Sequence, residues 1–169
     1  MLSTAVIKNA GQASSYFMEH DDYYSKEGEK FEQPSTWYGK GAEKLNLRGI
    51  VDKETFNKML DGKLPNGIQI GVSKNGDIRH RAGFDLTLSV PKSWSIAHYA
   101  TKDPLFAQIT EQAAKLTADL IERDCAMASR YENGKQHAEL TGNLVFAFHY
   151  HRLSRELDMQ DHIHMNVMN

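Results

Sequence analysis

Three segments of the chain carry a large apolar side chain at every second position, which is the two-residue period of a β-strand that packs one face in a core. They span residues 84–90, 142–151 and 161–167. In the first segment Leu86 and Leu88 point to one side, and Asp85 and Thr87 point to the other. Because the apolar side of such strands must be covered, the pattern predicts a sheet with another layer packed against it.

The longest periodic segment predicts a helix for that layer. Asp103 and Pro104 favour a helix start, and we expect the helix to run from there to about Ser129. Its large apolar residues recur near helical spacing and form one stripe, which should cover the sheet. The stripe consists of Leu105, Ile109, Leu116, Leu120 and Met127.

Shorter patterns complete the predicted architecture. Asp52 and Gly62 mark the ends of a helix over residues 53–60, and Asn75-Gly76 marks the turn of a hairpin. The other expected elements are a strand at 1–7, a helix at 10–18, a polar loop or lid at 19–34, and hairpin arms at 68–72 and 77–81. Strand-rich ends around helices predict an α+β layer sandwich, and 169 residues predict one domain over residues 1–169.

Charge and composition exclude several classes of protein. The net charge is -2, so there is no overall basic surplus of the kind that marks many nucleic-acid-binding proteins. Cys125 is the single cysteine, which excludes an intramolecular disulfide and a multi-cysteine zinc site. The longest apolar run, 144–148, is far shorter than the ~20 residues that span a bilayer. We therefore expect no membrane association and a cytoplasmic location.

Histidines on the last two strands form the first candidate site. His162 and His164 are two residues apart, so both rings leave the same face of a strand. The preceding strand ends in His151, with His149 two residues before it, and an antiparallel return brings that end beside the pair. Three imidazoles would leave coordination positions open, as a catalytic metal requires. The alternative is that these histidines are ordinary polar residues of half-buried strands. The remaining histidines lack metal-ligand spacing and are expected to be surface or packing residues: His20, His80, His98 and His137.

Tyrosines near the N-terminus and one carboxylate are the other candidates. Tyr16 precedes the pair Tyr23-Tyr24, and Tyr16 and Tyr23 would share a helix face if the helix persists. A tyrosine oxygen has a pKa of about 10, so it attacks phosphorus well only when a base or a metal helps to remove its proton. Asp85 lies on the polar face of its strand. The alternatives are packing or surface tyrosines and a hydrogen-bonded strand carboxylate.

The order of these motifs resembles the relaxase domain of large conjugative plasmid-transfer relaxase-helicases, the His-hydrophobic-His endonucleases that nick a transfer origin. The resemblance covers essentially the whole chain, and its most particular part is Gly-Phe-Asp-Leu-Thr-Leu-Ser-Val-Pro-Lys-Ser at 83–93. The other landmarks are Tyr16 with Tyr23-Tyr24, Gly-Lys-Gly-Ala-Glu at 39–43, Thr-Gly-Asn-Leu-Val at 141–145, His151-x-x-Ser154-Arg155 and His162-Ile-His164.

The resemblance implies a fold and a reaction. The fold is a five-stranded antiparallel sheet with helices packed on it, the palm of relaxases and rolling-circle endonucleases. The reaction is metal-dependent, site- and strand-specific nicking of single-stranded DNA at a transfer origin, through a 5′-phosphotyrosyl link and a free 3′-hydroxyl that allows strand transfer and rejoining. By position, the resemblance assigns Tyr16 as first nucleophile, Tyr23 or Tyr24 as second, Asp85 as orienting group or proton acceptor, and His151, His162 and His164 as metal ligands.

The cofactor and the partners follow from the same comparison. Three neutral imidazoles bind zinc or nickel tightly, whereas a phosphate reaction can run on magnesium or manganese. The expected partners are single-stranded origin DNA and relaxosome accessory proteins. Basic residues near the proposed site would supply a local positive groove for DNA despite the overall charge: Arg81, Lys92, Arg152 and Arg155.

The chain departs from the family at three points. Phe17 follows Tyr16 where relatives often have a second tyrosine, and Asp161 replaces an apolar residue and puts a carboxylate near the site. Relatives continue beyond the histidine strand through DNA-clamping helices and then a helicase, so we expect a fragment or short form, the N-terminal portion of the family's domain. Two alternatives to a nicking enzyme follow: a truncated, catalytically incomplete origin-DNA-binding module, or a three-histidine metal site with no nucleic acid role.

Overall fold

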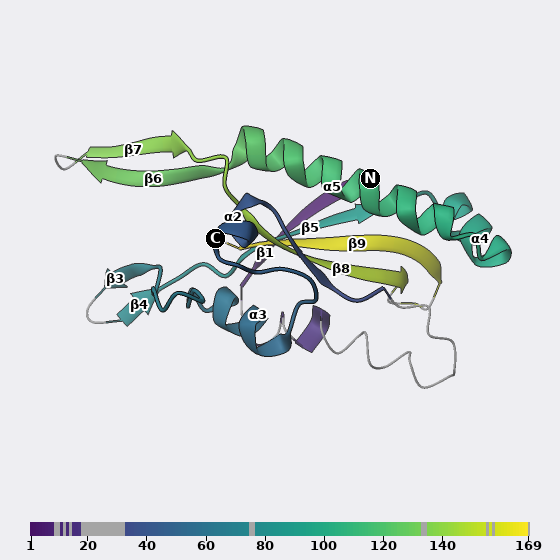
Figure 1. Cartoon of the computed structure of the whole chain (residues 1–169), viewed down its shortest axis with the longest axis horizontal. Helices are drawn as coiled ribbons and strands as arrows, with labels where there is room; N and C mark the ends of the chain where they lie inside the picture. Colours follow the sequence, from purple (N-terminus) through teal and green to yellow (C-terminus); the bar gives the residue numbers. More distant parts are fainter. Residues whose placement is uncertain are drawn as a thin grey trace.

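The computed structural model describes residues 1–8, 11, 13, 15–17, 33–74, 77–132, 135–154, 156 and 158–168. Its centre is a five-stranded antiparallel sheet with the strand order β1-β5-β9-β8-β2 (Figure 1). The α+β class and the antiparallel sheet expected from the sequence are thereby confirmed. The strands are β1 (Leu2–Ile7), β2 (Thr36–Tyr38), β5 (Gly83–Ser89), β8 (Val145–Leu153) and β9 (Met159–Met168).

The three central strands are those that the alternating pattern predicts. β9 lies between β5 and β8, and Ile163 and Met165 on its apolar face are 2% and 0% exposed. They pack with Leu86 of β5 and with Phe146 and Phe148 of β8 in one core. β9 extends beyond the predicted 161–167 at both ends, β5 is shifted by one residue from the predicted 84–90, and β8 begins at Val145 rather than at residue 142 and ends at Leu153. The polar side chains of β9 lie on the opposite face, where His164 and Asn166 are buried as well.

Two helices, α4 (Lys92–Thr101) and α5 (Pro104–Cys125), lie on the apolar face of the sheet (Figure 1). The start of α5 is as predicted, because the Asp103 side chain accepts a hydrogen bond from the backbone N–H of Leu105 at 2.9 Å. The end differs from the prediction, since α5 stops at Cys125 and Met127 begins the strand β6 (Met127–Glu132). α4 has no counterpart in the sequence-based prediction.

The face of α5 that covers the sheet is not the predicted one. Large apolar side chains of the predicted stripe lie at the surface, with exposed fractions of 45–64%. The buried residues of α5 are small or polar, and Ala114 and Ala118 are fully buried against the core that contains Phe146 and Phe148, with Ile121 partly buried beside them. The aromatic rings fill the space next to these two positions, so only a short side chain fits at Ala114 and at Ala118. The exposed stripe residues are Leu105, Ile109, Leu116 and Leu120.

The opposite face of the sheet is covered by the helix α3 (Lys53–Leu60), which begins as predicted. The Asp52 carboxylate accepts from the backbone N–H of Thr55 at 2.8 Å, and Gly62 follows the helix with a φ of +75°. Phe56 of α3 is fully buried in a second core on this face. Further members of that core are Ile7, Phe17, Trp37, Met59, Leu60, Ala147 and Met168.

The short helix α2 (Lys40–Lys44) lies close to the start of β8. The backbone N–H of Gly41 donates to the carbonyl of Leu144 at 2.8 Å. A Cβ at this position would lie 2.5 Å from that carbonyl oxygen, so the close approach requires glycine. The Gly-Lys-Gly run at 39–41 is therefore a packing feature of the fold.

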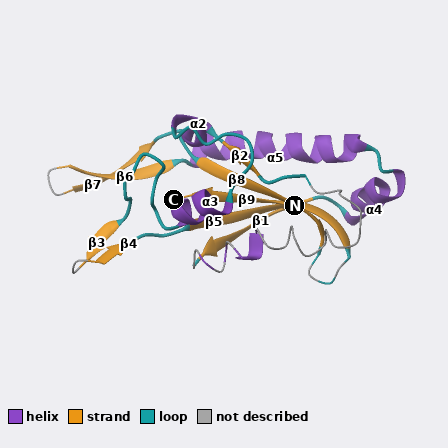
Figure 2. Ribbon diagram, turned by 60° about the horizontal axis from the view of Figure 1, so that its bottom comes forward, coloured by secondary structure: helices purple, strands orange, loops and turns teal. Residues whose placement is uncertain are grey.

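Two hairpins extend from the end of the sheet opposite α4 (Figure 2). The first pairs β3 (Val72–Lys74) with β4 (Asp77–Arg79). The hairpin was predicted, but its first arm lies at 72–74 instead of 68–72 and its second arm is shorter than 77–81. Its turn, Asn75-Gly76, lies outside the described residues. The second pairs β6 with β7 (Lys135–Leu140) and was not predicted.

At the N-terminus, residues 11, 13 and 15–17 are helical, in agreement with the expected helix at 10–18. Most of the expected loop at 19–34 lies outside the described residues. Within the described ranges, no helix has the length and apolar character needed to cross a membrane.

Candidate active site

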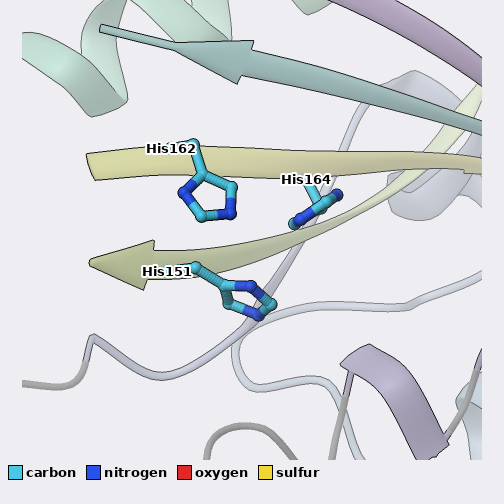
Figure 3. A group of neighbouring side chains, drawn as sticks. All are labelled: His151, His162 and His164. Atoms are coloured by element: carbon cyan, nitrogen blue, oxygen red, sulfur yellow. The ribbon is translucent and has the colours of Figure 1, made fainter. Parts of the chain in front are cut away.

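The antiparallel pairing of β8 and β9 brings three histidines together on the α3 side of the sheet. His151 lies opposite His162 in the register, and His149 lies opposite His164. One potential ligand nitrogen from each of His151, His162 and His164 lies within 4.8 Å of the other two, as Figure 3 illustrates for the three rings. This separation is short enough for all three nitrogens to reach one ion. The structure therefore assembles the three-histidine group that the sequence suggested.

The tautomers of two rings are set by their acceptors. The Nδ1 of His162 lies 2.7 Å from the carbonyl oxygen of Gln160, which can only accept, so Nδ1 carries the proton. The Nδ1 of His164 donates to the carboxylate of Asp85, with distances of 2.9 and 3.0 Å to its two oxygens. In a neutral ring each Nε2 is then a lone-pair donor. The buried Nε2 of His164 has no hydrogen-bond partner within the described part of the chain, and this fits a metal-ligand position.

Burial favours the neutral form of the ring that a metal needs. It lowers the pKa of His162, an effect opposed by the hydrogen bond to the Gln160 carbonyl and reinforced by the neighbouring His164. A neutral imidazole can bind a cation without first losing a proton. Burial of His162 therefore favours the form of its ring that can bind a cation.

His149 lies outside this group, although the sequence left it as an alternative to His151. Its side chain is fully buried, and its Nδ1 lies 2.9 Å from the hydroxyl oxygen of Ser35. Its ring stacks on Phe17 with centroids 5.3 Å apart. Burial, together with His164, lowers the pKa of His149 to about 3, against a smaller opposing interaction with Asn166. His149 is therefore a neutral packing residue beneath the cluster.

Tyr16 lies beside the histidines. Its ring centroid is 5.8 Å from that of His164 and 6.4 Å from that of His151. The next residue, Phe17, is 4% exposed and packs its ring 5.0 Å from His164. Phe17 therefore anchors the helical segment that carries Tyr16 to the sheet. The other candidate tyrosines, Tyr23 and Tyr24, lie outside the described residues.

Asp85 lies among polar side chains of neighbouring strands. Besides His164, its carboxylate accepts from the Thr87 hydroxyl at 3.3 Å and from the Asn166 amide at 3.1 Å. The Thr87 oxygen also lies 3.2 Å from the Nδ1 of His164. Sequence reasoning selected Asp85 but gave no role to Thr87 or Asn166. Only the alternation of β9 could have indicated that Asn166 shares a face with His164.

The four basic candidates lie in different places. The Arg81 guanidinium lies 5.9 Å from the centroid of Phe84, whose ring packs in the core beneath α5, so the structure does not bring Arg81 to the histidines. The Lys92 ammonium lies 2.8 Å from the Asp158 carboxylate, just before β9. Arg152 is half-buried and follows His151 where the pairing of β8 and β9 shifts register. Arg155 lies outside the described residues.

Asp161 does not place its carboxylate in the site, contrary to expectation. Its side chain lies on the α4 side of β9, with an oxygen 2.6 Å from the Nδ1 of His98, and both side chains are largely buried. His98 is thus a packing residue, one of the two roles expected for it. Of the other histidines, His80 is half-buried, His137 is exposed, and His20 lies outside the described residues.

Comparison with known proteins gives matches to relaxases and to a conjugation protein. The family model described as TrwC relaxase matches residues 10–169. A curated relative, the multifunctional conjugation protein TraI of Escherichia coli, is 39% identical over 173 residues. That alignment covers 100% of this chain and 9% of TraI, so the chain spans less than a tenth of the length of this relative.

Solved structures give the same match in three dimensions. Conjugative relaxase TrwC in complex with oriT DNA, in a metal-free structure, has a TM-score of 0.83 and 35% identity. The metal-bound structure of TrwC with oriT DNA has a TM-score of 0.84 and 34% identity. Each match covers 100% of this chain, and 56% and 57% respectively of the TrwC chains. The chain therefore spans little more than half of the solved relatives.

Proposed function

The chain belongs to the TrwC relaxase family, and on that premise we propose that it nicks single-stranded DNA at a plasmid transfer origin by transesterification to a tyrosine. The observation that carries the proposal is the position of Tyr16, whose ring lies 5.8 Å from the ring of His164 in the three-histidine cluster. A phenol beside a cluster of potential metal ligands fits attack on phosphorus, because a cation lowers the cost of forming the phenolate. The curated relative named a conjugation protein and the solved relatives bound to oriT DNA support the substrate class.

We propose that His151, His162 and His164 hold a divalent ion. Three imidazole nitrogens within 4.8 Å of one another, with the Nδ1 protons of two rings engaged elsewhere, fit such an ion. When bound, the ion would withdraw charge from the nonbridging oxygens of the scissile phosphate. The metal-bound structure of TrwC supports this assignment. Magnesium or manganese fits the phosphate chemistry, whereas zinc or nickel fits the affinity of three imidazoles.

Tyr16 is the proposed first nucleophile. Its phenolic oxygen forms a bond to phosphorus as the bond from phosphorus to the 3′-oxygen breaks, and the phenolic proton is lost while the 3′-oxygen gains one. One phosphodiester replaces another, so the step is close to reversible and the free 3′-hydroxyl can rejoin or transfer the strand. Tyr23 or Tyr24 would serve a second transfer.

Asp85 acts on His164 in this proposal. Its carboxylate accepts the Nδ1 proton of His164, which leaves Nε2 to face the proposed ion. The partners of the carboxylate, namely His164, Thr87 and Asn166, support an orienting role over that of a proton acceptor for the tyrosine.

We further propose single-stranded origin DNA and relaxosome accessory proteins as partners, and the cytoplasm as the location.

A covalent adduct tests the proposal. The chain is incubated with single-stranded origin oligonucleotides and Mg²⁺ or Mn²⁺, and a denaturing gel is examined for a protein–DNA band. We expect a band that disappears with a chelator. DNA retention that weakens with salt, without an adduct, would instead indicate the origin-DNA-binding module. Metal binding without any DNA affinity would indicate the three-histidine metal site alone.

A further inference from the structure

Asn166 is a fully buried amide on the face of β9 that carries the proposed metal ligands. It lies two residues after His164 on the same face of β9, and its exposed fraction is 0%. In the sheet it pairs with Asp85 of β5 on one side and with Ala147 of β8 on the other. A polar side chain in this central position has no access to water and depends on protein partners for its hydrogen bonds.

The Asn166 amide donates to one oxygen of Asp85. The distance from its Nδ2 to that oxygen, Oδ1, is 3.1 Å. The other oxygen, Oδ2, accepts from the Thr87 hydroxyl at 3.3 Å. Both oxygens lie 2.9–3.0 Å from the Nδ1 of His164. Donors on both sides therefore fix the plane of the carboxylate with its two oxygens directed toward the imidazole.

This arrangement makes the orientation of His164 depend on Asn166. The side chains of His164 and Asp85 are only 7% and 14% exposed, so little water is present to replace a missing donor. Without Asn166, the carboxylate could rotate about its Cβ–Cγ bond and lose its geometry toward Nδ1. A freed Nδ1 would allow the other tautomer, in which Nε2 carries the proton and cannot bind a cation.

We propose that Asn166 is a positioning residue that acts through Asp85 to hold His164 in its Nδ1–H tautomer, with Nε2 directed at the metal position. The inference rests on the proposed function for the identity of the metal site, and it deepens that proposal. Asn166 does not reach the reacting groups itself. Its role is to complete the hydrogen bonds of the carboxylate that orients a ligand.

Calorimetric titration of Co²⁺ into the metal-free chain tests the proposal through Asn166→Leu, which has a similar volume and no donor. We expect a Kd weaker by about tenfold or more, within the 10–100-fold range typical of partners behind a metal ligand. A Kd within about twofold of the parent would overturn the proposal. If N166L does not fold, Asn166→Ala provides the same comparison with a smaller side chain.

Two controls separate positioning from simple loss of packing. Val167→Ala removes core volume from the opposite face of β9, so we expect it to lower the melting temperature and leave the Co²⁺ Kd within about twofold of the parent. In an Asp85→Ala background, N166L should cause no further loss of affinity, since its route to His164 is already absent. A full additional loss in that background would contradict action through Asp85.

The histidine tautomers give a readout without metal. Long-range ¹H–¹⁵N NMR spectra of the metal-free chain should show His164 as the Nδ1–H tautomer, and N166L should shift it toward a mixture. If the parent binds no Co²⁺, the proposed metal site fails, but this comparison still decides the role of Asn166. An unchanged tautomer in N166L would contradict the inference even if the parent binds metal.

Discussion

His98 of α4 and Asp161 of β9 form a buried pair with 2.6 Å between the imidazole Nδ1 and the carboxylate oxygen. The pair lies on the face of β9 opposite the histidine cluster. Asp161 also donates its backbone N–H to the Ser95 hydroxyl at 2.8 Å, so α4 holds the beginning of β9 by two contacts. These contacts fix the backbone immediately before His162.

Asp161→Ala should therefore destabilise the fold strongly, because it leaves the imidazole of His98 buried without its partner. We expect the free energy of unfolding to fall by about 1–3 kcal/mol, the usual cost of leaving a buried polar group without its hydrogen-bond partner. The matched control is Lys92→Ala, which breaks the exposed pair with Asp158 and should cost less than about 1 kcal/mol. Urea denaturation of both variants measures the difference. Equal losses would show that the His98–Asp161 pair contributes no more than a surface pair.

Removal of a single proposed metal ligand should weaken metal binding more than a substitution that acts on a ligand indirectly, such as Asn166→Leu. For His162→Ala and His164→Ala we expect the affinity for Co²⁺ to fall by at least about 100-fold. This equals or exceeds the largest loss that is typical for residues hydrogen-bonded to a ligand. Calorimetric titration measures this, and circular dichroism should show that the fold survives. His149→Gln should retain most of the affinity, and a larger loss there than in His151→Ala would change the assignment of the third ligand.

Tyr16→Phe separates chemistry from folding, because it keeps the aromatic ring and removes only the attacking oxygen. Adduct formation should fall by orders of magnitude, while oligonucleotide affinity changes little, since stacking does not need the hydroxyl. The two measurements are a denaturing gel and fluorescence anisotropy, both at one salt concentration and saturating metal. A full adduct in Tyr16→Phe together with its loss in Tyr23→Phe or Tyr24→Phe would reverse the proposed order of the tyrosines.

The low pKa of His149 predicts a loss of stability in acid. The unfolded chain takes up a proton on this ring below about pH 6.5, whereas the folded chain excludes it until about pH 3. The free energy of unfolding of the metal-free chain should therefore decrease as the pH falls through this window, by up to about 1.4 kcal/mol per pH unit from this ring. His149→Gln should show a smaller slope in urea denaturation between pH 6.5 and 5. Identical slopes would contradict this account.

Substitutions on the two faces of α5 should change the free energy of unfolding by different amounts, because small buried residues face the sheet and large residues face the solvent. Ala114→Leu inserts a large side chain against a filled aromatic layer and should cost about 1–3 kcal/mol. Leu116→Ala, at a position that is 64% exposed, should change the free energy of unfolding by no more than about 0.5 kcal/mol. Thermal or urea denaturation compares them. A larger loss in Leu116→Ala would mean that the outer stripe of α5 is covered in solution.

Elements with a periodic apolar pattern, a helix-capping residue or a turn motif in the sequence could be predicted, and elements without such a signal could not. β8 and β9 alternate because one face packs under α5, and their antiparallel return was enough to bring His151 to His162. The buried side chains of α4 include Ser95 and His98, so its pattern has little apolar periodicity to detect. The strand β7 is exposed along its whole length, so it has no alternation of burial that the sequence could reveal. The partners of Asn166 depend on the register across three strands, which the sequence does not contain.

All three proposed ligands come from one short stretch of chain, residues 151–164, folded back on itself as two neighbouring strands. Such a stretch can chelate an ion even when the rest of the chain has unfolded. Ion binding to the denatured ensemble offsets part of the stabilisation expected from the affinity of the native state. An ion at this site should therefore raise the melting temperature less than its Kd alone predicts.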